Sequence, residues 1–377
     1  MTVKILIIHP HLDALGGSEV LTSILTRELQ TFGHELVVVS RARRADLFPN
    51  KSKIKYLYFR KVQETGDIVF DRIKSILTTV HHAITKYGPD VILIMIQEPI
   101  YALISKLIKP SIGVAMYIHF PFEEELTLEK IKIFLEMYRF PGRYESLFHI
   151  ADLHMTNSAY TARTLHVNFR IESNIVYPAI FWDYYEEEPA LTKIPGPNII
   201  SVGRFVPHKR LDVLIKLFKD IVKKEVPEAE LTIVGIPDPR YREYYESIKE
   251  LAESVKDVTL IDRALKPLEM IEVYRSARVY VHMRVGEHFG MAPLEAMSQG
   301  AVPVVPRQSG FAEVIKHGIS GYTYESDEEC IKYVIDLLKK SKSSYYKMRR
   351  RSYIRSLLFM PDRFTAELEG YLRILVH

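Results

Sequence analysis

Several features are scarce in this sequence of 377 residues, and each scarcity excludes a class of protein. Only one cysteine is present, Cys330, which excludes internal disulfides and cysteine-based zinc sites. We interpret it as a buried structural thiol in a protein of a reducing compartment. The longest apolar runs, such as VILIMI from Val91, are far shorter than the ~20 residues that cross a bilayer, so we expect no membrane-spanning segment.

The N-terminus also has little that resembles a secretory leader. It enters KILIIHP at once, an apolar stretch that is too short and has no small-residue cleavage site. We therefore expect a cytoplasmic protein. A strong excess of one charge is missing as well, because 51 basic and 47 acidic residues give a net charge of +4. This balance gives no indication of nucleic acid as a partner.

The basic residues are nevertheless clustered. Residues 41–61 (RARRADLFPNKSKIKYLYFRK) contain eight bases and one acid, and residues 339–355 (KKSKSSYYKMRRRSYIR) contain eight bases and no acid. Each run is either a solvated face or a surface that contacts anionic lipid. Both interpretations stay open from the sequence, and the second predicts peripheral attachment to a membrane.

Short β-branched runs alternate with longer helical patterns, which is typical of α/β domains with parallel sheets. The pattern occurs twice. We predict strands at 3–10, 35–40, 91–96, 114–120 and 153–158, and again at 198–205, 229–235, 257–263, 277–283 and 301–306. Helices are predicted at 18–33 and from positions near Leu211, Tyr241, Pro267, Ala292 and Gly310.

A segment with four prolines and no periodicity separates the two halves. We therefore predict two doubly wound, Rossmann-like domains, 1–180 and 198–360, joined by a linker at 181–197. A helix at about 361–377 is expected to pack back on the first domain. Ligands of such sheets bind at the carboxyl ends of the strands, so we expect a shared site in a cleft that both domains face.

Paired glycines follow the first predicted strand in HPHLDALGGSE. Gly16 and Gly17 allow a phosphate to approach backbone amides at a helix N-terminus, although tight packing between strand and helix explains them equally well. The nearby His9, His11 and Asp13 have spacing that any polar strand end produces, and we predict no metal there.

Two cations follow the first strand of the second half, in SVGRFVPHKRLD. Arg204 and Lys209 leave the carboxyl end of that strand, where together they suit a diphosphate. A solvated turn is the alternative. In the first half, His119 ends an apolar strand and is either directed into the cleft or a core histidine.

The segment GEHFGMAPLEAM places Glu287 before a predicted helix and Glu295 inside its first turns. The backbone amides of Phe289, Gly290 and Met291 lie at the positive end of that helix, where phosphate and sugar oxygens bind. Carboxylates accept hydrogen bonds from neighbouring hydroxyls, so one acid can hold a hexose and the other a ribose. The two acids need not form a catalytic pair.

These segments together resemble the retaining glycosyltransferases of family 4, which have the two-domain GT-B fold. The resemblance rests on the two spaced glutamates with FG between them, on EAMSQGAVPVV, SGFAEVIKHGISGY and VGRFVPHKRLD, and on the N-terminal GGSE, in that family's order. It implies a donor domain at 198–360 that binds a nucleotide sugar and an acceptor domain at 1–180.

The resemblance also implies a role for each matching residue. Glu287 is expected to contact the donor sugar, Glu295 the ribose, and Arg204 and Lys209 the diphosphate. His119 matches a histidine near the transferred sugar. Gly16 and Gly17 match the loop over the diphosphate and acceptor. Arg263 and Leu265 match the segment that lines the nucleobase. No Asp-x-Asp motif is present, so we expect no metal or other cofactor.

A narrower similarity is to the mannosyltransferases that extend the dolichol-linked core of N-glycans from GDP-mannose. It is carried by IHFPF, HIADLHMTNSAYTA, NIVYPAI and GRFVPHKRLD. It implies mannose as the sugar and a polyprenyl-pyrophosphate-linked acceptor. The alternatives are a transferase with another donor or acceptor, an epimerase or phosphorylase on the same fold, and a noncatalytic sugar-nucleotide binder. The oligomeric state is not indicated.

Overall fold

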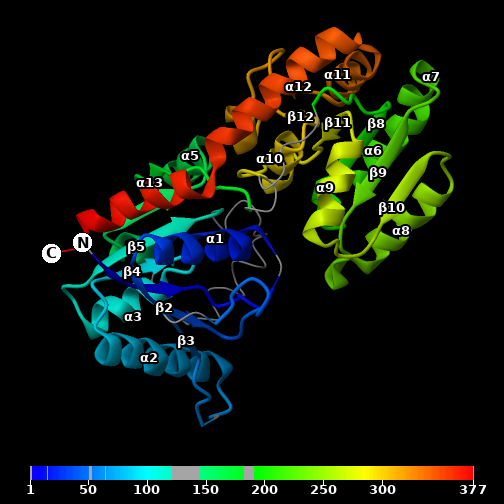
Figure 1. Ribbon diagram of the computed structural model, residues 1–377. Helices are drawn as coiled ribbons and strands as arrows, with labels where there is room; N and C mark the ends of the chain where they lie inside the picture. The colour runs from blue at the N-terminus through cyan, green and yellow to red at the C-terminus, as the bar shows by residue number, and fades with distance from the viewer. Residues whose placement is uncertain are drawn as a thin grey trace. The chain divides into compact units, whose positions relative to one another are not determined.

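A computed structural model of the chain describes residues 2–14, 16–50, 53–63, 65–120, 144–181 and 191–376. They form two compact units, each with its own sheet and core (Figure 1). Unit 1 is Met1–Ala179 with Pro361–His377, and unit 2 is Ile180–Met360. Part of the linker expected at 181–197 lies outside the described residues.

Unit 1 is built on a parallel sheet of seven strands. Its elements are β1 (Lys4–Ile8), α1 (Gly17–Thr31), β2 (Glu35–Ser40), β3 (Ile54–Tyr58), α2 (Ile68–Tyr87), β4 (Val91–Ile94), α3 (Ile100–Ile108), β5 (Gly113–Ile118), the 3-10 helix η2 (Tyr144–Ile150), β6 (Leu153–Thr156), α5 (Ala159–Phe169), β7 (Asn174–Ile175) and α13 (Pro361–Ile374). The strand order is β3-β2-β1-β4-β5-β6-β7.

The central strands of this sheet are apolar along their whole length. KILII of β1, VILI of β4 and GVAMYI of β5 have almost no polar position, because helices cover both faces of the sheet. Figure 1 shows α1 and α13 on one face and α2 and α3 on the other. The continuous runs are therefore what made these strands predictable.

Helix α13 is held in unit 1 by polar and steric contacts. Glu369 lies 2.8 Å from Nε2 of His34, and Arg363 donates to the carbonyl of Tyr177 at 2.6 Å. The end of the chain crosses β5 so closely that a β-carbon added at Gly113 would lie 2.6 Å from the carbonyl oxygen of Leu375. Gly113 is thus required by the approach of two backbones.

Unit 2 is built on a parallel sheet of six strands. Its elements are β8 (Asn198–Val202), η4 (Pro207–Lys209), α6 (Leu211–Leu217), the π-helical turn η5 (Phe218–Val222), α7 (Lys223–Glu225), β9 (Glu230–Val234), η6 (Pro239–Tyr241), α8 (Arg242–Glu253), β10 (Val258–Ile261), α9 (Pro267–Ser276), β11 (Val279–Val281), α10 (Met291–Ser298), β12 (Val302–Pro306), η7 (Gly310–Glu313), β13 (Tyr322–Tyr324), α11 (Asp327–Lys339), α12 (Lys342–Ser356) and η8 (Leu357–Phe359).

The strand order in unit 2 is β10-β9-β8-β11-β12-β13. Both sheets therefore have a point where successive crossovers run in opposite directions, between β1 and β4 in unit 1 and between β8 and β11 in unit 2. Ligands of open α/β sheets bind beside the carboxyl ends of the strands at such a point. Cys330 is buried in the core of unit 2, as a structural thiol requires.

Several elements are absent from the sequence prediction. Strand β3 falls in the basic run 41–61 and was not recognised, because Lys55 interrupts its apolar pattern at the sheet edge. Helix α2 and the three-residue strand β13 were not recognised either. None of the described helices has the length and apolar content needed to traverse a bilayer.

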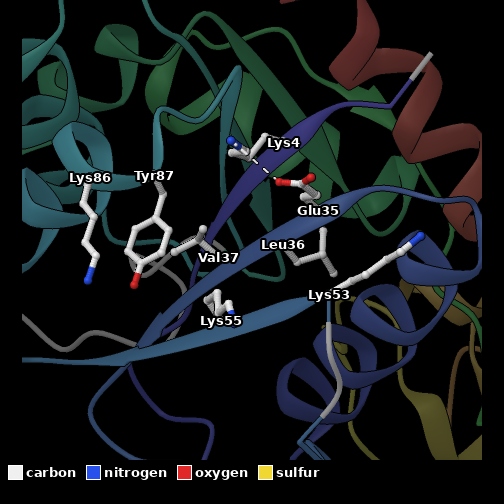
Figure 2. A pocket seen from close by; sticks show the side chains of 8 residues that line it. All are labelled: Lys4, Glu35, Leu36, Val37, Lys53, Lys55, Lys86 and Tyr87. Carbon is white, nitrogen blue, oxygen red and sulfur yellow. Dashed lines mark ion pairs between the residues drawn. The ribbon is translucent and has the colours of Figure 1, made fainter.

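A hollow of ≈ 350 Å³ lies at the amino ends of β1, β2 and β3 and beside the end of α2 (Figure 2). Its lining residues are Lys4, Glu35, Leu36, Val37, Lys53, Lys55, Lys86 and Tyr87. One carboxylate, that of Glu35, lies 3.6 Å from Lys4. The hollow therefore lies at the amino ends of the strands, whereas ligands at a switch point bind beside the carboxyl ends.

The contact between β5 and the chain end can be tested with a single methyl group. Gly113→Ala should lower the free energy of unfolding of unit 1 by about 1–3 kcal/mol, since the added β-carbon meets backbone that cannot rotate away. Gly370→Ala is the matched control, because Gly370 is in α13 and has nothing within 4 Å of an added β-carbon. Urea unfolding should show no loss, or a gain of up to about 1 kcal/mol, in the control. Equal stability of both variants would show that the chain end does not dock as described.

Candidate functional site

A cluster of charged and polar side chains that contact one another lies at the switch point of unit 2. Lys209 follows β8, and His282, Arg284 and Glu287 follow β11, the strand paired with β8. Neighbouring parallel strands end at the same edge of a sheet, so residues 78 positions apart in the chain meet here. Two of the four, Lys209 and Glu287, were predicted from the sequence.

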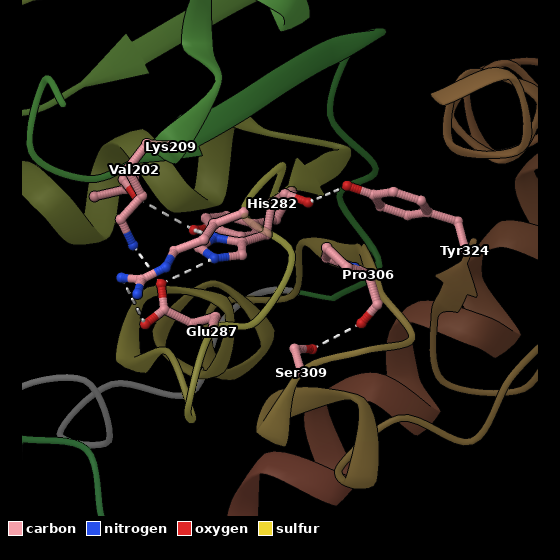
Figure 3. Close-up of polar contacts among 9 residues, drawn as sticks. Val202, Lys209, His282, Glu287, Pro306, Ser309 and Tyr324 are labelled. Carbon is pink, nitrogen blue, oxygen red and sulfur yellow. Dashed lines mark hydrogen bonds and ion pairs between the residues drawn. The ribbon is translucent and has the colours of Figure 1, made fainter. Parts of the chain in front are cut away.

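Glu287 is the centre of this group (Figure 3). Its Oε2 accepts from the ammonium of Lys209 and lies 3.2 Å from Nε2 of His282. Its Oε1 lies 3.7 Å from Nη1 of Arg284, which is beyond hydrogen-bond distance. The exposed fractions of these four side chains are 17% or less. One carboxylate thus holds two cations and a histidine in a largely buried cluster.

The cluster contains two cationic side chains and one carboxylate, and burial together with these charges shifts the pKa values of Glu287 and His282. Burial opposes ionisation of Glu287, but Lys209, His282 and Arg284 outweigh it and hold the pKa of Glu287 well below its ordinary value. Burial lowers the pKa of His282, despite its contact with Glu287, so the imidazole is neutral at pH 7. The cluster therefore keeps a net positive charge, which attracts an anion.

The backbone around Glu287 is fixed on both sides. Gly310 donates its N–H to the Glu287 carbonyl at 2.8 Å, and Gly286 donates to the carbonyl of Gln308 at 2.8 Å. Gly290 has a φ of 88°, a conformation that side chains other than glycine rarely adopt, and it starts α10 directly after the cluster. Phe289 is buried against Phe311. The helix N-terminus predicted at 289–291 is therefore present.

Arg204 does not join this cluster. Its Nη1 lies 3.2 Å from Asp238, which also accepts two hydrogen bonds from the Arg240 side chain. Arg240 and Arg204 hold the pKa of Asp238 well below its ordinary value. The guanidinium of Arg204 is 59% exposed and that of Arg240 is 65% exposed. Arg204 and Lys209 are thus held by different carboxylates, and Arg240 and Asp238 were missed by the sequence analysis.

Glu295 lies in α10 with its own partner. Tyr274 donates its hydroxyl to Glu295 Oε2 at 2.9 Å. Burial raises the pKa of Glu295 to about 7, against the hydrogen bond from Tyr274, which lowers it. Glu295 and Glu287 therefore have separate partners and opposite pKa shifts, and the expectation that they are not a catalytic pair remains a prediction.

The segment expected to line a nucleobase, between β10 and α9, is at the surface. Arg263 is paired with Glu269 at 2.8 Å, and Glu269 also accepts from the backbone of Lys266 at the start of α9. Leu265 is half-buried. Arg263 is therefore paired with the residue that caps α9, and its role toward a base stays a prediction.

In unit 1, the paired glycines start α1 as predicted. Glu19 lies in the first turn of that helix, and a β-carbon added at Gly16 would be 2.6 Å from its Oε2. The carboxylate thus occupies the region where a phosphate was expected. Oε1 of Glu19 also lies 3.7 Å from Nε2 of His9. The phosphate role of Gly16 and Gly17 stays a prediction and requires Glu19 to move or to bind the ligand itself.

Two histidines follow central strands of the unit 1 sheet, His9 after β1 and His119 after β5. Burial, His119 and His11 lower the pKa of His9 to about 3, and burial lowers the pKa of His119 to about 4. Both are neutral at pH 7. The Nε2 atoms of His9 and His119 are buried and have no hydrogen-bond partner among the described residues. Each Nε2 atom is therefore available for a hydrogen bond with a polar ligand. Because both imidazoles are neutral, neither attracts an anion by its charge.

Among the described parts of the chain, no group of three His, Cys, Asp or Glu side chains is arranged to hold a metal ion. The residues that the sequence analysis missed find their partners in two ways. Asp238 and Tyr274 matter through Arg204 and Glu295, which are distant in the chain, whereas His282 and Arg284 contact Glu287 within the same loop. A position after a strand end was the one available indication for Asp238, His282 and Arg284.

The raised pKa of Glu295 predicts a pH-dependent stability. Its folded pKa of about 7 exceeds the ordinary 4.5, so the stabilisation is fully present below pH 4.5 and is lost as pH rises through 7. Between pH 5 and pH 8, Glu295→Gln should remove a pH-dependent loss of roughly 3 kcal/mol in unfolding free energy. Urea titrations of both proteins at each pH measure this. Parallel pH profiles for Glu295→Gln and the unaltered protein would contradict the assigned environment.

Two family models match the chain. The model described as Glycosyltransferase Family 4 matches residues 15–180, and the model described as Glycosyl transferases group 1 matches residues 186–355. Among solved structures, Anabaena Alr3699/HepE in complex with UDP and glucose has a TM-score of 0.75 and 15% identity, over 99% of this chain and 100% of that one. Sucrose-phosphate synthase from Thermosynechococcus elongatus has a TM-score of 0.78 and 15% identity, over 99% of both chains.

Relatives of known activity are also similar in sequence. Human alpha-1,3/1,6-mannosyltransferase ALG2 is 25% identical over 283 residues, which cover 68% of this chain and 67% of that protein. The Saccharomyces cerevisiae enzyme of that name is 25% identical over 366 residues, 83% and 71% of the two chains. The human GDP-Man:Man(3)GlcNAc(2)-PP-Dol alpha-1,2-mannosyltransferase is 26% identical over 243 residues, 59% and 48% of the two chains. The two family models together match nearly the whole chain, and its two parallel-sheet units have the GT-B fold of the solved structures. The chain therefore belongs to the glycosyltransferases that these models describe.

Proposed function

We propose that the chain transfers mannose from GDP-mannose to a sugar linked to a polyprenyl pyrophosphate, with retention of anomeric configuration. The similarity to alpha-1,3/1,6-mannosyltransferase ALG2 across 83% of the chain is the observation that carries the choice of sugar. The similarity to the human GDP-Man:Man(3)GlcNAc(2)-PP-Dol alpha-1,2-mannosyltransferase supports GDP-mannose as donor and a dolichyl-pyrophosphate-linked glycan as acceptor. The geometry of unit 2 supports the chemistry, as follows.

The reaction breaks the bond between the anomeric carbon and a phosphate oxygen, so negative charge builds on the departing diphosphate. In this proposal Lys209 and Arg204 stabilise that charge together with the N-terminus of α10 at Gly290 and Met291. The net positive charge around Glu287 supports the role of Lys209, whereas Arg204 would act from its position beside Asp238. Because these groups are in place before the reaction, we propose that no divalent metal is needed.

Glu287 has two tasks in the proposal. Its Oε2 holds Lys209 and His282 in position, and its Oε1, beyond hydrogen-bond distance of Arg284, accepts from a hydroxyl of the donor sugar. Such an arrangement positions the cation and the sugar through one side chain. A carboxylate whose pKa is held low remains an acceptor throughout the reaction.

The remaining predicted residues are given these roles. Glu295 accepts from the ribose hydroxyls, which favours its ionised form, so nucleotide binding releases a proton below pH 7. His119 contacts the transferred sugar. The base is contacted by Arg263 and Leu265, the donor by Phe289 at the start of α10, and the diphosphate and acceptor by Gly16 and Gly17. The proton of the acceptor hydroxyl passes to the departing phosphate.

A lipid-linked acceptor places the enzyme at a membrane surface. We propose peripheral attachment on the cytoplasmic face, where nucleotide sugars and anionic lipids are both available. The basic runs 41–61 and 339–355 are the candidates for that contact.

The proposed reaction is tested with purified protein and radiolabelled GDP-mannose, with a short polyprenyl-pyrophosphate-linked glycan in detergent as acceptor. Labelled lipid product is expected in the presence of EDTA. Parallel reactions contain UDP- and ADP-sugars, a soluble sugar acceptor, or no acceptor. Faster transfer to the soluble sugar would refute the lipid-linked acceptor, and conversion of the donor without any acceptor would indicate an epimerase.

The assignment of the diphosphate ligands predicts the effect of two substitutions. Lys209→Ala and Arg204→Ala should each lower kcat by about two to three orders of magnitude, because each removes a preorganised charge from the leaving group. Arg242→Ala is the matched control, since Arg242 is an 84% exposed arginine of the same unit with a partner only at 3.9 Å. Steady-state rates at saturating donor measure this, with circular dichroism to establish folding. A folded Lys209→Ala enzyme with the rate of the control would contradict the proposal.

A further inference from the structure

A stretch near the end of unit 2 has an unusual charge composition. Residues 337–361 contain eight Lys or Arg residues and no Asp or Glu. The stretch comprises the end of α11, the whole of α12 and the turn η8. The charge is therefore confined to one helix and its immediate surroundings.

Four of the eight bases are used inside the protein. Lys339 is paired with Glu225 at 2.6 Å and Lys340 with Asp336 at 2.8 Å. Arg349 is buried and donates to the Lys193 carbonyl at 2.6 Å, and Arg355 donates to the Val314 carbonyl. The other four are Lys342, Lys347, Arg350 and Arg351, all exposed and without an ion pair among the described residues.

The free cations lie next to exposed aliphatic side chains. Lys347, Arg350, Arg351 and Ile354 follow the spacing i, i+3, i+4, i+7 and so share one face of α12. Ile354 is 47% exposed, and Leu357 and Leu358 in the following turn are 39% and 58% exposed. A solvated surface needs the cations but gains nothing from three neighbouring aliphatic groups in water.

We propose that this face, defined by Lys347, Arg350, Arg351, Ile354, Leu357 and Leu358 and here called the α12 face, binds the surface of an anionic bilayer. The cations match phosphate and carboxylate headgroups, and the aliphatic side chains enter the boundary between headgroups and acyl chains. This inference rests on one part of the proposed function, namely that the acceptor is in a membrane. It names unit 2 as the unit that touches the lipid.

The other basic run makes a poorer lipid surface. In 41–61, Arg44 is paired with Asp46, and Arg43 donates to Tyr58 and Asn50. Two of its lysines, Lys53 and Lys55, lie around the hollow in Figure 2, directly before and within the edge strand β3. Substitutions there give a control with the same charge change on unit 1.

The test is cosedimentation of the full chain with vesicles, without substrate. Phosphatidylcholine vesicles that contain about one third phosphatidylserine are compared with pure phosphatidylcholine vesicles at low salt. The unaltered protein should bind the anionic vesicles only. Arg350→Ala with Arg351→Ala should weaken binding by roughly twentyfold to thirtyfold, about fivefold for each base removed. Lys53→Ala with Lys55→Ala should leave binding unchanged.

The aliphatic contribution is separated by salt. Ile354→Ser with Leu358→Ser should weaken binding at every salt concentration, whereas high salt should weaken binding of the unaltered protein through its cations. All substituted residues are exposed, so each variant should fold and transfer sugar to a detergent-dispersed acceptor at the unaltered rate.

The outcomes are distinct. Vesicle binding that the Arg350 and Arg351 substitutions leave intact, or that the control pair abolishes, overturns the α12 face. Equal binding to both vesicle types, or no binding to either, overturns it as well. So does vesicle binding that the Ile354 and Leu358 substitutions leave unchanged. Arginine-dependent vesicle binding without sugar transfer in detergent would instead support the face and refute the proposed function.

Discussion

The ion pair between Lys209 and Glu287 is the constraint on which the site depends. It joins the loops after β8 and β11 at the one place in unit 2 where the crossovers diverge. Glu287 is largely buried, so its charge persists only because Lys209, His282 and Arg284 surround it. A carboxylate with two cations leaves a surplus of positive charge beside the N-terminus of α10. This surplus of positive charge is the feature to which we assign the diphosphate in the proposed reaction.

Burial and charge act in opposite ways at the two glutamates of the site. Glu287 is kept ionised by neighbouring cations, whereas Glu295 has only the hydroxyl of Tyr274 and its pKa rises to about 7. In unit 1, His9 and His119 are neutral and have buried nitrogen atoms to offer to a ligand. The charged side chains of the candidate residues are therefore in unit 2, and the buried histidines of unit 1 are neutral.

The sequence was most informative where the physical pattern is local. Buried parallel strands such as β1, β4 and β5 are continuous apolar runs, and the fold class followed from their alternation with helices. Strand β3 was missed because its position at the sheet edge allows Lys55 within it and Lys53 directly before it. Glu287 and Lys209 were named individually, but their contact was not, since it joins residues 78 apart. Asp238 was missed for the same reason, because its partner Arg204 is distant in the chain. Arg284 was missed although Glu287 is only three residues away, because no local pattern specifies which side chains of a loop converge at a sheet edge.

The central claim is that fixed side chains of unit 2, rather than a metal ion, receive the leaving diphosphate. A crystal structure of the chain with GDP, grown in the presence of magnesium, tests it most directly. The account predicts β-phosphate oxygens within hydrogen-bond distance of Lys209 Nζ and of backbone amides at the start of α10, with Glu287 still in contact with Lys209. A diphosphate bound through a magnesium ion, or one distant from Lys209, would contradict it.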